Sequence, residues 1–227
     1  MNVVKNEQYY KRPNNKGNIF KNRGTLFQLF AFRKSLIDAL NGLNITIDEK
    51  ILDVGCGNGG TLRQLIEFGF KPQNIYGIDT SQERINDCAS RYPNLWLYLG
   101  DASKMPYEDN FFDIVLESTL FIELTDDEIS KKIADEMVRV CKPNGYILLI
   151  DWRYSYFHPE KKALDKKRIS KLFGSSTELV GVKYGALIPQ VGYFVANHFY
   201  PLYFMIQWLL PELVGQTITV LRKVQNE

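Results

Sequence analysis

The amino-acid sequence predicts an α/β protein with a doubly wound, mostly parallel sheet. Two observations predict it. Short apolar runs alternate with stretches of helical periodicity between residues 51 and 150, and the first of these runs leads into a glycine-rich turn. Strand–helix alternation with short loops places helices on both faces of a parallel sheet. The chain has 227 residues, 45% of them hydrophobic, which is enough for one domain with a single sizeable core.

The N-terminal part of the chain contains a polar segment and then a helix. Residues 1–18 are polar and rich in Asn and Lys, which predicts a flexible arm. Residues 19–40 carry apolar side chains at helical spacing, so we expect an amphipathic helix that ends near Asn41 and Gly42. No apolar signal segment is visible, and the three cysteines show neither disulfide nor metal-ligand spacing. These features predict a cytoplasmic protein.

Residues 48–152 contain the regular alternation. The strands are expected at residues 51–54, 75–78, 95–99, 112–116 and 146–150, and the helices at 61–68, 82–91 and 126–140. Thr125 to Glu128 has the pattern of a capping box, whose hydroxyl and carboxylate satisfy free N–H groups of the first helical turn. Residues 142–145 (KPNG) predict a turn that leads into the fifth strand.

The C-terminal part differs in composition. Residues 153–216 are expected to form a cap region with a basic helix near its start, and residues 217–224 a final strand. Between Lys183 and Glu212 there is no formally charged side chain. Three prolines divide this apolar stretch into pieces shorter than the ~20 residues that a membrane-spanning helix needs. We therefore expect no membrane span but a helical cap over the core or the substrate. The alternative is an apolar patch in peripheral contact with a membrane or a lipid-linked substrate.

The glycine-rich turn carries the strongest functional signal. Residues 51–60 (ILDVGCGNGG) run from an apolar strand through the turn into a helix. Glycines allow close approach of a ligand and positive φ, and ligands of doubly wound sheets bind at the carboxyl ends of the strands. The turn fits two patterns, G-x-G-x-x-G through Gly60 and G-x-G-x-G through Gly59, and alone it does not choose between them.

Three carboxylates follow three successive predicted strands. Asp53 would repel a pyrophosphate and suits a ligand with an ammonium group and a positive centre. Asp79 is placed to accept both hydroxyls of a ribose, as in NAD or S-adenosylmethionine, and Asp101 to accept the exocyclic amine of an adenine. Charge-assisted hydrogen bonds of this kind contribute roughly 1.5–3 kcal/mol each. Each residue alone is equally well explained as a cap or a turn residue, but their joint placement favours a nucleoside site.

The chain resembles the class I S-adenosylmethionine-dependent methyltransferases over about residues 48–152. Five motifs occur in the family's order, at residues 53–59 (DVGCGNG), 77–79 (GID), 100–102 (GDA), 112–115 (FDIV) and 139–145 (RVCKPNG). The stretches 30–34 and 116–121 look more weakly like small bacterial members. The resemblance implies a Rossmann-like, doubly wound, seven-stranded sheet whose last strand is antiparallel. Here it would carry an N-terminal helix and a helical C-terminal cap insertion.

The resemblance also implies S-adenosyl-L-methionine as cofactor and assigns residues to it. Gly55, Cys56 and Gly57 would pass closest to the methionine portion, with Asp53 nearby. The other implied cofactor residues are Asp79 and Thr80 at the ribose, Asp101 and Ala102 at the adenine, and Glu117 near the sulfonium and the acceptor entrance.

An acceptor hydroxyl also needs a general base. Asp151, just after the fifth strand, and His158 are the candidates, although Asp151 is equally well explained as a carboxylate that supports the fold. His198 in the uncharged stretch is a candidate for the acceptor pocket or a hydrogen-bonded core residue. Tyr9 and Tyr10 either fold over the cofactor or are disordered.

Several absences narrow the acceptor. The fourth strand is followed by LEST rather than by the Asn-Pro-Pro-Tyr type of motif, which argues against amino-methylation of adenine or glutamine. Lys+Arg 28 against Asp+Glu 26 gives a net charge of +2 and no basic stripe, which argues against a nucleic-acid partner. The sequence thus favours methyl transfer, to oxygen, on a small-molecule, sugar or lipid-linked acceptor. The alternatives are an NAD-dependent oxidoreductase and a non-catalytic nucleoside-binding protein on the same fold.

Overall fold

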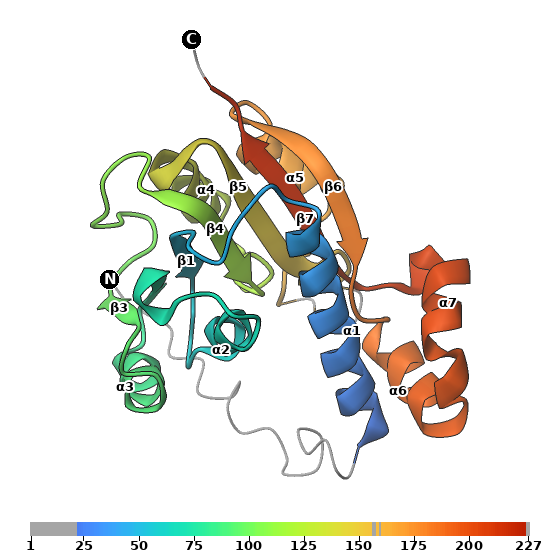
Figure 1. Cartoon of the computed structure of the whole chain (residues 1–227). Coiled ribbons are helices and arrows are strands. Elements are labelled where there is room, and N and C mark those ends of the chain that lie inside the picture. Colours follow the sequence, from blue (N-terminus) through green and yellow to red (C-terminus); the bar gives the residue numbers. More distant parts are fainter. Residues whose placement is uncertain (1–21, 156–157, 159, 226–227) are drawn as a thin grey trace.

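The computed structural model describes residues 22–155, 158 and 160–225, and within them the chain forms one seven-stranded sheet with helices on both faces (Figure 1). The strand order is β3-β2-β1-β4-β5-β7-β6. The strands are β1 (Ile51–Val54), β2 (Ile75–Asp79), β3 (Trp96–Leu99), β4 (Phe112–Ser118), β5 (Cys141–Trp152), β6 (Thr177–Tyr184) and β7 (Gln216–Lys223). This architecture confirms the predicted α/β class and the seven-stranded sheet.

Seven α-helices connect or flank these strands in the described residues. They are α1 (Arg23–Asn41), α2 (Gly60–Glu67), α3 (Gln82–Arg91), α4 (Asp127–Val140), α5 (Lys166–Phe173), α6 (Pro189–His198) and α7 (Tyr203–Leu209). Three short 3-10 helices are η2 (Pro72–Asn74), η3 (Tyr200–Leu202) and η4 (Pro211–Leu213). Helix α1 confirms the predicted N-terminal helix, whereas the arm predicted for residues 1–18 lies outside the described residues.

The pairing of the strands brings their carboxyl ends to one edge. β3, β2, β1, β4 and β5 run parallel, and β7 pairs antiparallel with both β5 and β6. In this register Val54 pairs with both Ile78 and Glu117, while Asp151 pairs with Thr217 of β7. The strand ends of β1, β2 and β4 therefore meet at the edge where a doubly wound sheet binds its ligands.

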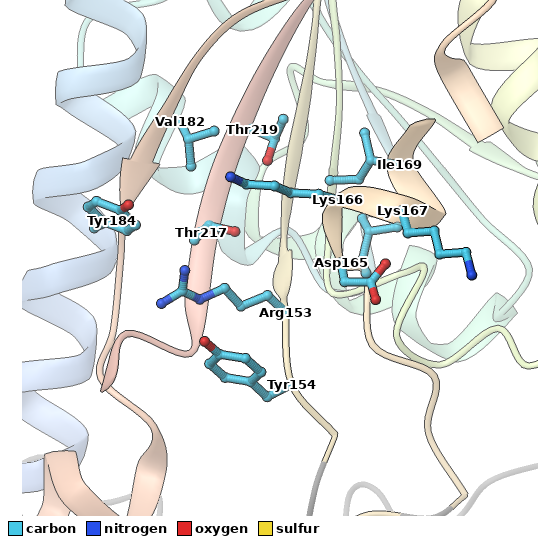
Figure 2. A pocket seen from close by; sticks show the side chains of 11 residues that line it. Arg153, Tyr154, Asp165, Lys166, Lys167, Ile169, Val182, Tyr184, Thr217 and Thr219 are labelled. Atoms are coloured by element: carbon cyan, nitrogen blue, oxygen red, sulfur yellow. The ribbon is translucent and has the colours of Figure 1, made fainter. Parts of the chain in front are cut away.

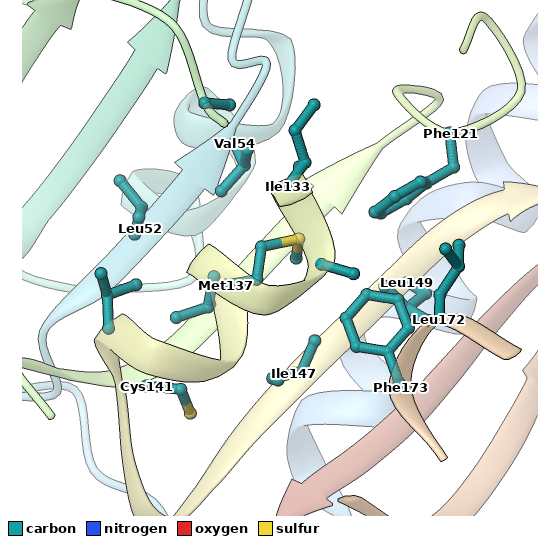
Figure 3. Packing of buried hydrophobic residues seen from close by; sticks show 14 of the residues in the cluster. Leu52, Val54, Phe121, Ile133, Met137, Cys141, Ile147, Leu149, Leu172 and Phe173 are labelled. Atoms are coloured by element: carbon teal, nitrogen blue, oxygen red, sulfur yellow. The ribbon is translucent and has the colours of Figure 1, made fainter. Parts of the chain in front are cut away.

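Alternate side chains of the buried strands form two separate cores. On one face Leu52, Val54 and Leu149 pack against α4 and α5, as Figure 3 shows around Met137 and Phe173. On the opposite face the neighbouring side chains of the same strands pack against α1, α2 and α3. Because successive side chains of a strand point to opposite faces, a parallel sheet covered on both sides needs such continuous apolar strands.

A third, smaller core attaches the C-terminal helices. Tyr203 of α7 and Val195 of α6 are buried with Ala31 of α1 and Leu187. Figure 1 shows α6 and α7 beside α1, beyond the ends of β6 and β7. No helix among the described residues is both long and apolar enough to cross a bilayer.

The structure corrects three local predictions. The cap of α4 is Asp126, whose carboxylate accepts from the N–H groups of Glu128 and Ile129, so the predicted role of Thr125 is wrong. Residues 142–145 do not precede β5 but bulge within it, because Phe112 pairs with Cys141 and Ile114 with Tyr146. The edge strand β6 fills a segment for which the sequence pattern had predicted no element.

Candidate functional site

The glycine-rich turn after β1 adopts a conformation that requires glycine at three positions. Gly55, Gly57 and Gly59 have φ values of 75°, 54° and 84°, in the left-handed region. A Cβ at Gly59 would also lie 2.6 Å from the sulfur of Cys88. Gly60 is the first residue of α2, where nothing lies within 4 Å of a Cβ position. The structure therefore selects the G-x-G-x-G pattern from the two that the sequence allowed.

Asp79 joins the turns after β1 and β2. Its Oδ2 accepts from the N–H of Gly57 at 2.9 Å, and its Oδ1 accepts from the N–H of Ser81 at 2.8 Å. The guanidinium of Arg84 lies 3.8 Å from Oδ2. A carboxylate has about four lone-pair sites, so each oxygen of Asp79 retains capacity for a ligand hydroxyl. Its side chain is buried at the carboxyl edge of the sheet.

Asp53 is fully enclosed between β2 and β4. Its side chain is 1% exposed, and no hydrogen-bond partner within the described residues reaches its Oδ1. Burial raises the pKa of this carboxyl well above its usual range, and the nearby charge of Asp79 raises it further. An unpartnered buried acid is costly, and a cationic ligand group beside it would offset that cost.

Glu117 and Asp151 form a second pair of buried acids, on the α4–α5 face of the sheet. Oε2 of Glu117 accepts from the N–H of Leu120 at 2.9 Å, while its Oε1 has no partner within the described residues. Asp151 accepts from the N–H groups of Ile122 and Trp152 at 2.9 and 2.7 Å. Burial raises the pKa of both acids, that of Asp151 to about 7.

The segment of residues 119–124, which follows β4, is held between these two acids. Its Leu120 side chain lies 3.1 Å from the Cβ position of Gly55, so this segment also contacts the glycine-rich turn. Thr119 has a φ of 60°, a conformation that is uncommon for a residue other than glycine. We call residues 119–124 the acid-anchored loop. The loop contacts the turn after β1, and its backbone donates hydrogen bonds to acids at the ends of β4 and β5.

Arg168 of α5 fixes the same loop from behind. Its guanidinium donates to the carbonyl oxygens of Phe121 at 2.8 Å and Leu124 at 2.6 Å. Its side chain is buried, and burial lowers the pKa of the guanidinium. Arg168 carries no sequence signal, because its partners are backbone carbonyl oxygens distant in sequence. The nearby Lys162 and Lys171 instead pair with Asp127 near the surface.

The remaining predicted cofactor residues lie around this centre in different environments. Asp101 is exposed, and its Oδ1 accepts from the N–H of Ser103 at 2.8 Å, which is the geometry of a turn. Ala102 is buried in the core beneath it, and Thr80 is exposed beside Asp79. Burial is the main reason that the pKa of the Cys56 thiol is strongly raised, so this thiol stays protonated.

The two histidines do not join the buried acids. His158 is exposed, with its side chain 61% accessible, and its Nδ1 lies 3.0 Å from Glu160. His198 is exposed at the end of α6, where its Nδ1 lies 3.0 Å from the carbonyl oxygen of Phe194. For His198 the sequence left two alternatives, a residue of the acceptor pocket or a hydrogen-bonded core residue. The structure excludes the core residue, because the side chain is exposed, and His198 is not among the residues that line the groove described next.

An open groove of about 370 Å³ lies beyond β5 on the α5 face (Figure 2). Arg153 and Tyr154 of the segment after β5 line it, together with Thr217 and Thr219 of β7. Figure 2 shows Lys166 extending from α5 toward Thr219, whereas Lys167 points away. Sequence reasoning missed this groove because it forms only when β6 and β7 pair beside α5.

Comparisons with known proteins agree with this geometry. Residues 51–145 match the family described as "Methyltransferase domain". A fatty-acid O-methyltransferase of Mycolicibacterium smegmatis is 35% identical over 49% of this chain and 40% of its own length. A tRNA (carboxymethyluridine(34)-5-O)-methyltransferase of Arabidopsis thaliana is 33% identical over 45% of this chain and 24% of its own. The chain thus spans less than half the length of these curated relatives.

Solved structures match over most of the chain. A SAM-dependent methyltransferase from Methanosarcina mazei superimposes with a TM-score of 0.62 and 19% sequence identity. The match covers 83% of this chain and 98% of that protein, so it extends well beyond residues 51–145. At this identity the likeness concerns the fold, and it includes strands of both halves of the sheet.

Proposed function

This chain carries a class I S-adenosylmethionine-dependent methyltransferase domain, and from that premise we propose that it methylates an oxygen atom of a small apolar or lipid-like acceptor. The cofactor is S-adenosyl-L-methionine. In this proposal residues 48–152 bind the cofactor and residues 153–216 contribute the acceptor side. The oxygen target and the acceptor class are the parts that the experiments below test.

The observation that carries the proposal is the cluster of buried acids at the ends of β1, β2 and β4. Oδ1 of Asp53 and Oε1 of Glu117 have no hydrogen-bond partner within the described residues, although both side chains are almost completely buried. S-adenosylmethionine has an ammonium group and a sulfonium centre, which are the charges that such carboxylates would stabilise. The residues present therefore fit the cofactor.

Each part of the cofactor has a proposed partner. Gly55, Cys56 and Gly57 would lie along the methionine portion, because the absence of Cβ atoms at the two glycines admits a ligand close to the backbone. Asp79 would accept the ribose hydroxyls with its free lone pairs, with Thr80 beside it. Asp101 and Ala102 would lie at the adenine; the exposed carboxylate of Asp101 is free to accept at Oδ2.

Bound S-adenosylmethionine supplies a methyl group that its sulfonium already activates. What the chain adds is position, because holding an acceptor oxygen in line at about 3 Å from the methyl carbon supplies much of the acceleration. We propose that the acid-anchored loop sets this position. It contacts the glycine-rich turn through Leu120, and Glu117, Asp151 and Arg168 hold its backbone at separate points.

The two predicted candidates for the general base, Asp151 and His158, lie in different environments. Both oxygens of Asp151 already accept backbone N–H groups, so its first proposed role is to hold the loop. Its pKa of about 7 nevertheless suits proton transfer near neutral pH, which keeps it as the leading candidate for the base. His158 has a suitable ordinary pKa, but it would have to approach from an exposed position.

The preference for an apolar acceptor rests on the side of the site beyond β5. The helices α6 and α7 contain no formally charged residue and expose several aromatic and aliphatic side chains. The fatty-acid O-methyltransferase relative supports both the oxygen target and a lipid acceptor. The tRNA-modifying relative also acts on oxygen by its name but on a nucleic acid, which the balanced charge of this chain does not favour.

The test is a transfer assay with methyl-labelled S-adenosylmethionine and a panel of fatty acids, quinols, phenols, sugars and tRNA. We expect label in a fatty acid or another apolar acceptor, as a base-labile ester or a stable ether, and no label in tRNA. The Asp79→Ala variant serves as the matched inactive control. Label confined to tRNA or to a nitrogen atom would contradict the proposal.

Calorimetric titration separates the alternative functions. Binding of S-adenosylhomocysteine without binding of NADH is expected, and the reverse result would favour the oxidoreductase. Binding of S-adenosylhomocysteine without transfer to any member of the panel would instead favour a non-catalytic nucleoside-binding protein.

A further inference from the structure

The outer side of α7 and the segment before it forms an exposed apolar patch. We define the apolar patch as Phe199, Leu202, Met205, Trp208 and Leu209. Their exposed fractions are 51%, 39%, 46%, 79% and 55%. Leu202, Met205 and Trp208 follow one another three residues apart, and Leu209 comes four residues after Met205. This helical spacing places them on one side of the helical segment.

The opposite side of the same segment is already packed. Tyr203 is fully buried in the third core, and Gln207 donates to the carbonyl oxygen of Tyr184 at 2.9 Å. The apolar patch is therefore not the inner face of a poorly packed helix. It is a second apolar side that the described part of the chain leaves uncovered, and exposed apolar surface of this extent marks an interaction site.

The chemistry of the patch favours a bilayer over a protein partner. No charged residue occurs between Lys183 and Glu212, whereas protein interfaces have a polar rim and use arginine at their centre. Tryptophan and tyrosine concentrate at the boundary between lipid and water. The helices α6 and α7 are too short to span a membrane, so contact would be with the surface of one leaflet.

Cations line the groove of Figure 2, and one of them, Arg153, contacts the segment that follows α7. Nε of Arg153 donates to the carbonyl oxygen of Val214 at 2.6 Å. A second N–H of the guanidinium donates to the carbonyl oxygen of Pro211, in the short segment that follows α7. Lys166 and Lys167 of α5 are also among the residues that line the groove, with the side chain of Lys167 pointing outward in Figure 2, and neither forms an ion pair with the described residues. The carboxylate of Asp165, also in the groove, already accepts from the N–H of Arg168.

The patch and the groove lie on the acceptor side of the sheet. Arg153 follows Asp151 by two residues, and Thr217 of the groove pairs with Asp151. A membrane surface that contacts both the apolar patch and the groove would therefore bring an amphiphilic acceptor toward the ends of β4 and β5. Cations beside an uncharged apolar surface are complementary to a leaflet that contains anionic lipid.

We propose that the apolar patch and the groove cations together dock the protein on an anionic membrane surface. The side chains of the patch enter the boundary between headgroups and acyl chains, and Arg153, Lys166 and Lys167 contact the lipid phosphates. Delivery of an apolar acceptor from that leaflet rests on the proposed function, whereas the docking itself does not require turnover.

The experiment is flotation of the full chain with vesicles, without any acceptor. We expect flotation with phosphatidylcholine mixed with phosphatidylglycerol, much less with phosphatidylcholine alone, and a decrease as salt rises. Leu209→Gln should weaken vesicle binding about tenfold, because one aliphatic side chain no longer leaves water. Leu179→Gln is the matched control, since Leu179 on the edge strand β6 is 62% exposed outside the patch.

The cations are tested in the same assay. Lys166→Gln together with Lys167→Gln should weaken binding to the anionic vesicles at least about fivefold. Lys132→Gln on the exposed side of α4 is the control. Titration of each variant with S-adenosylhomocysteine reports whether the fold and the cofactor site are intact, so a failure of docking is distinct from a failure of the proposed function.

Three results would overturn the proposal. The first is no flotation of the wild-type protein with anionic vesicles. The second is vesicle binding that Leu209→Gln and Leu179→Gln weaken to the same extent, or wild-type flotation that is equal with the anionic and the neutral vesicles. The third is a concentration-dependent dimer, seen by light scattering, that Trp208→Gln abolishes while vesicle binding is absent, because a second copy would then cover the patch.

Discussion

The two sides of the molecule differ in what they bury and what they expose. At the ends of β1, β2 and β4 the carboxylates of Asp53, Asp79 and Glu117 are buried, while the glycine-rich turn beside them is fixed by backbone hydrogen bonds. Beyond β5 the side chains that face outward on α7 are apolar and exposed. One side thus buries carboxylates and the other exposes apolar side chains. Both arrangements reduce the stability of the isolated protein.

The difference indicates what each side binds. A buried acid without a partner is explained by a small cationic ligand of fixed shape, for which a few side chains at strand ends suffice. An exposed apolar surface is explained by an extended and deformable partner, for which area and position matter more than any single hydrogen bond. The variants below test this contrast, in order of the expected effect.

Asp79→Ala should have the largest effect, on the side with the buried carboxylates. The variant loses the acceptor of the Gly57 and Ser81 N–H groups as well as the proposed ribose contacts. We expect the affinity for S-adenosylhomocysteine to fall at least tenfold and up to about a hundredfold, with the fold intact. Calorimetric titration measures the affinity, and circular dichroism reports the fold. An unchanged affinity would refute the ribose assignment.

Gly59→Ala and Gly60→Ala test whether the turn needs glycine where its conformation indicates. At Gly59 an alanine would combine a φ of 84° with a Cβ 2.6 Å from the sulfur of Cys88. The free energy of unfolding should fall by about 2 kcal/mol or more. Gly60→Ala, in open space at the start of α2, should be neutral or slightly stabilising. Equal stability of the two variants in urea would contradict this account of the turn.

The buried acids should make stability depend on pH. Burial raises the pKa of Asp151 to about 7, although its two backbone hydrogen bonds oppose the shift. Since its pKa is higher in the folded than in the unfolded protein, the stabilisation is present at low pH and is lost as pH rises through about 7. The free energy of unfolding should fall by about 1.4 kcal/mol between about pH 6 and pH 8.

Asp151→Asn is the control for this pH dependence. The amide does not titrate, so the slope between the two pH values should become smaller, and the residual slope belongs to Glu117 and Asp53, whose pKa values burial also raises. The variant is expected to be less stable overall, because an amide oxygen accepts from only one of the two N–H groups at Ile122 and Trp152. A slope equal to that of the wild type would show that Asp151 does not cause it.

Asp53→Asn should have the smallest effect, and its sign is informative. Removing a buried acid without a partner should raise the free energy of unfolding by up to about 1 kcal/mol near pH 8, while the affinity for S-adenosylmethionine falls. Asp101→Asn, at an exposed position, is the matched control and should change stability little. A clear loss of stability in Asp53→Asn would mean that the carboxylate has a structural partner.

Most of the fold could be predicted from the sequence because it rests on local patterns. The strands β1, β2, β4, β5 and the tail strand β7 have apolar runs that burial explains, and the structure confirms them together with the mostly exposed edge strand β3. β6 was missed since its burial is partial and Gly181 lies at a register shift. The cap of α4 was placed one residue early, since a hydroxyl and a carboxylate next to each other are both good caps.

The site was predictable only where strand ends determine it. The positions of Asp53, Asp79 and Glu117 follow from the order of strands, and the structure brings these residues to one edge. The environment of Asp151 does not follow, because its two hydrogen bonds depend on how residues 119–124 fold back. Arg168 was missed for the same reason, since its partners are backbone carbonyl oxygens distant in sequence. Their roles in catalysis stay predictions.

The most direct test of the central claim is a crystal structure of the protein with S-adenosylhomocysteine. We predict that the ribose hydroxyls lie within hydrogen-bond distance of Asp79 and that the amino-acid portion lies along Gly55 and Gly57 near Asp53. A nucleoside bound away from these strand ends, or a bound nucleoside whose ribose does not contact Asp79, would contradict the account.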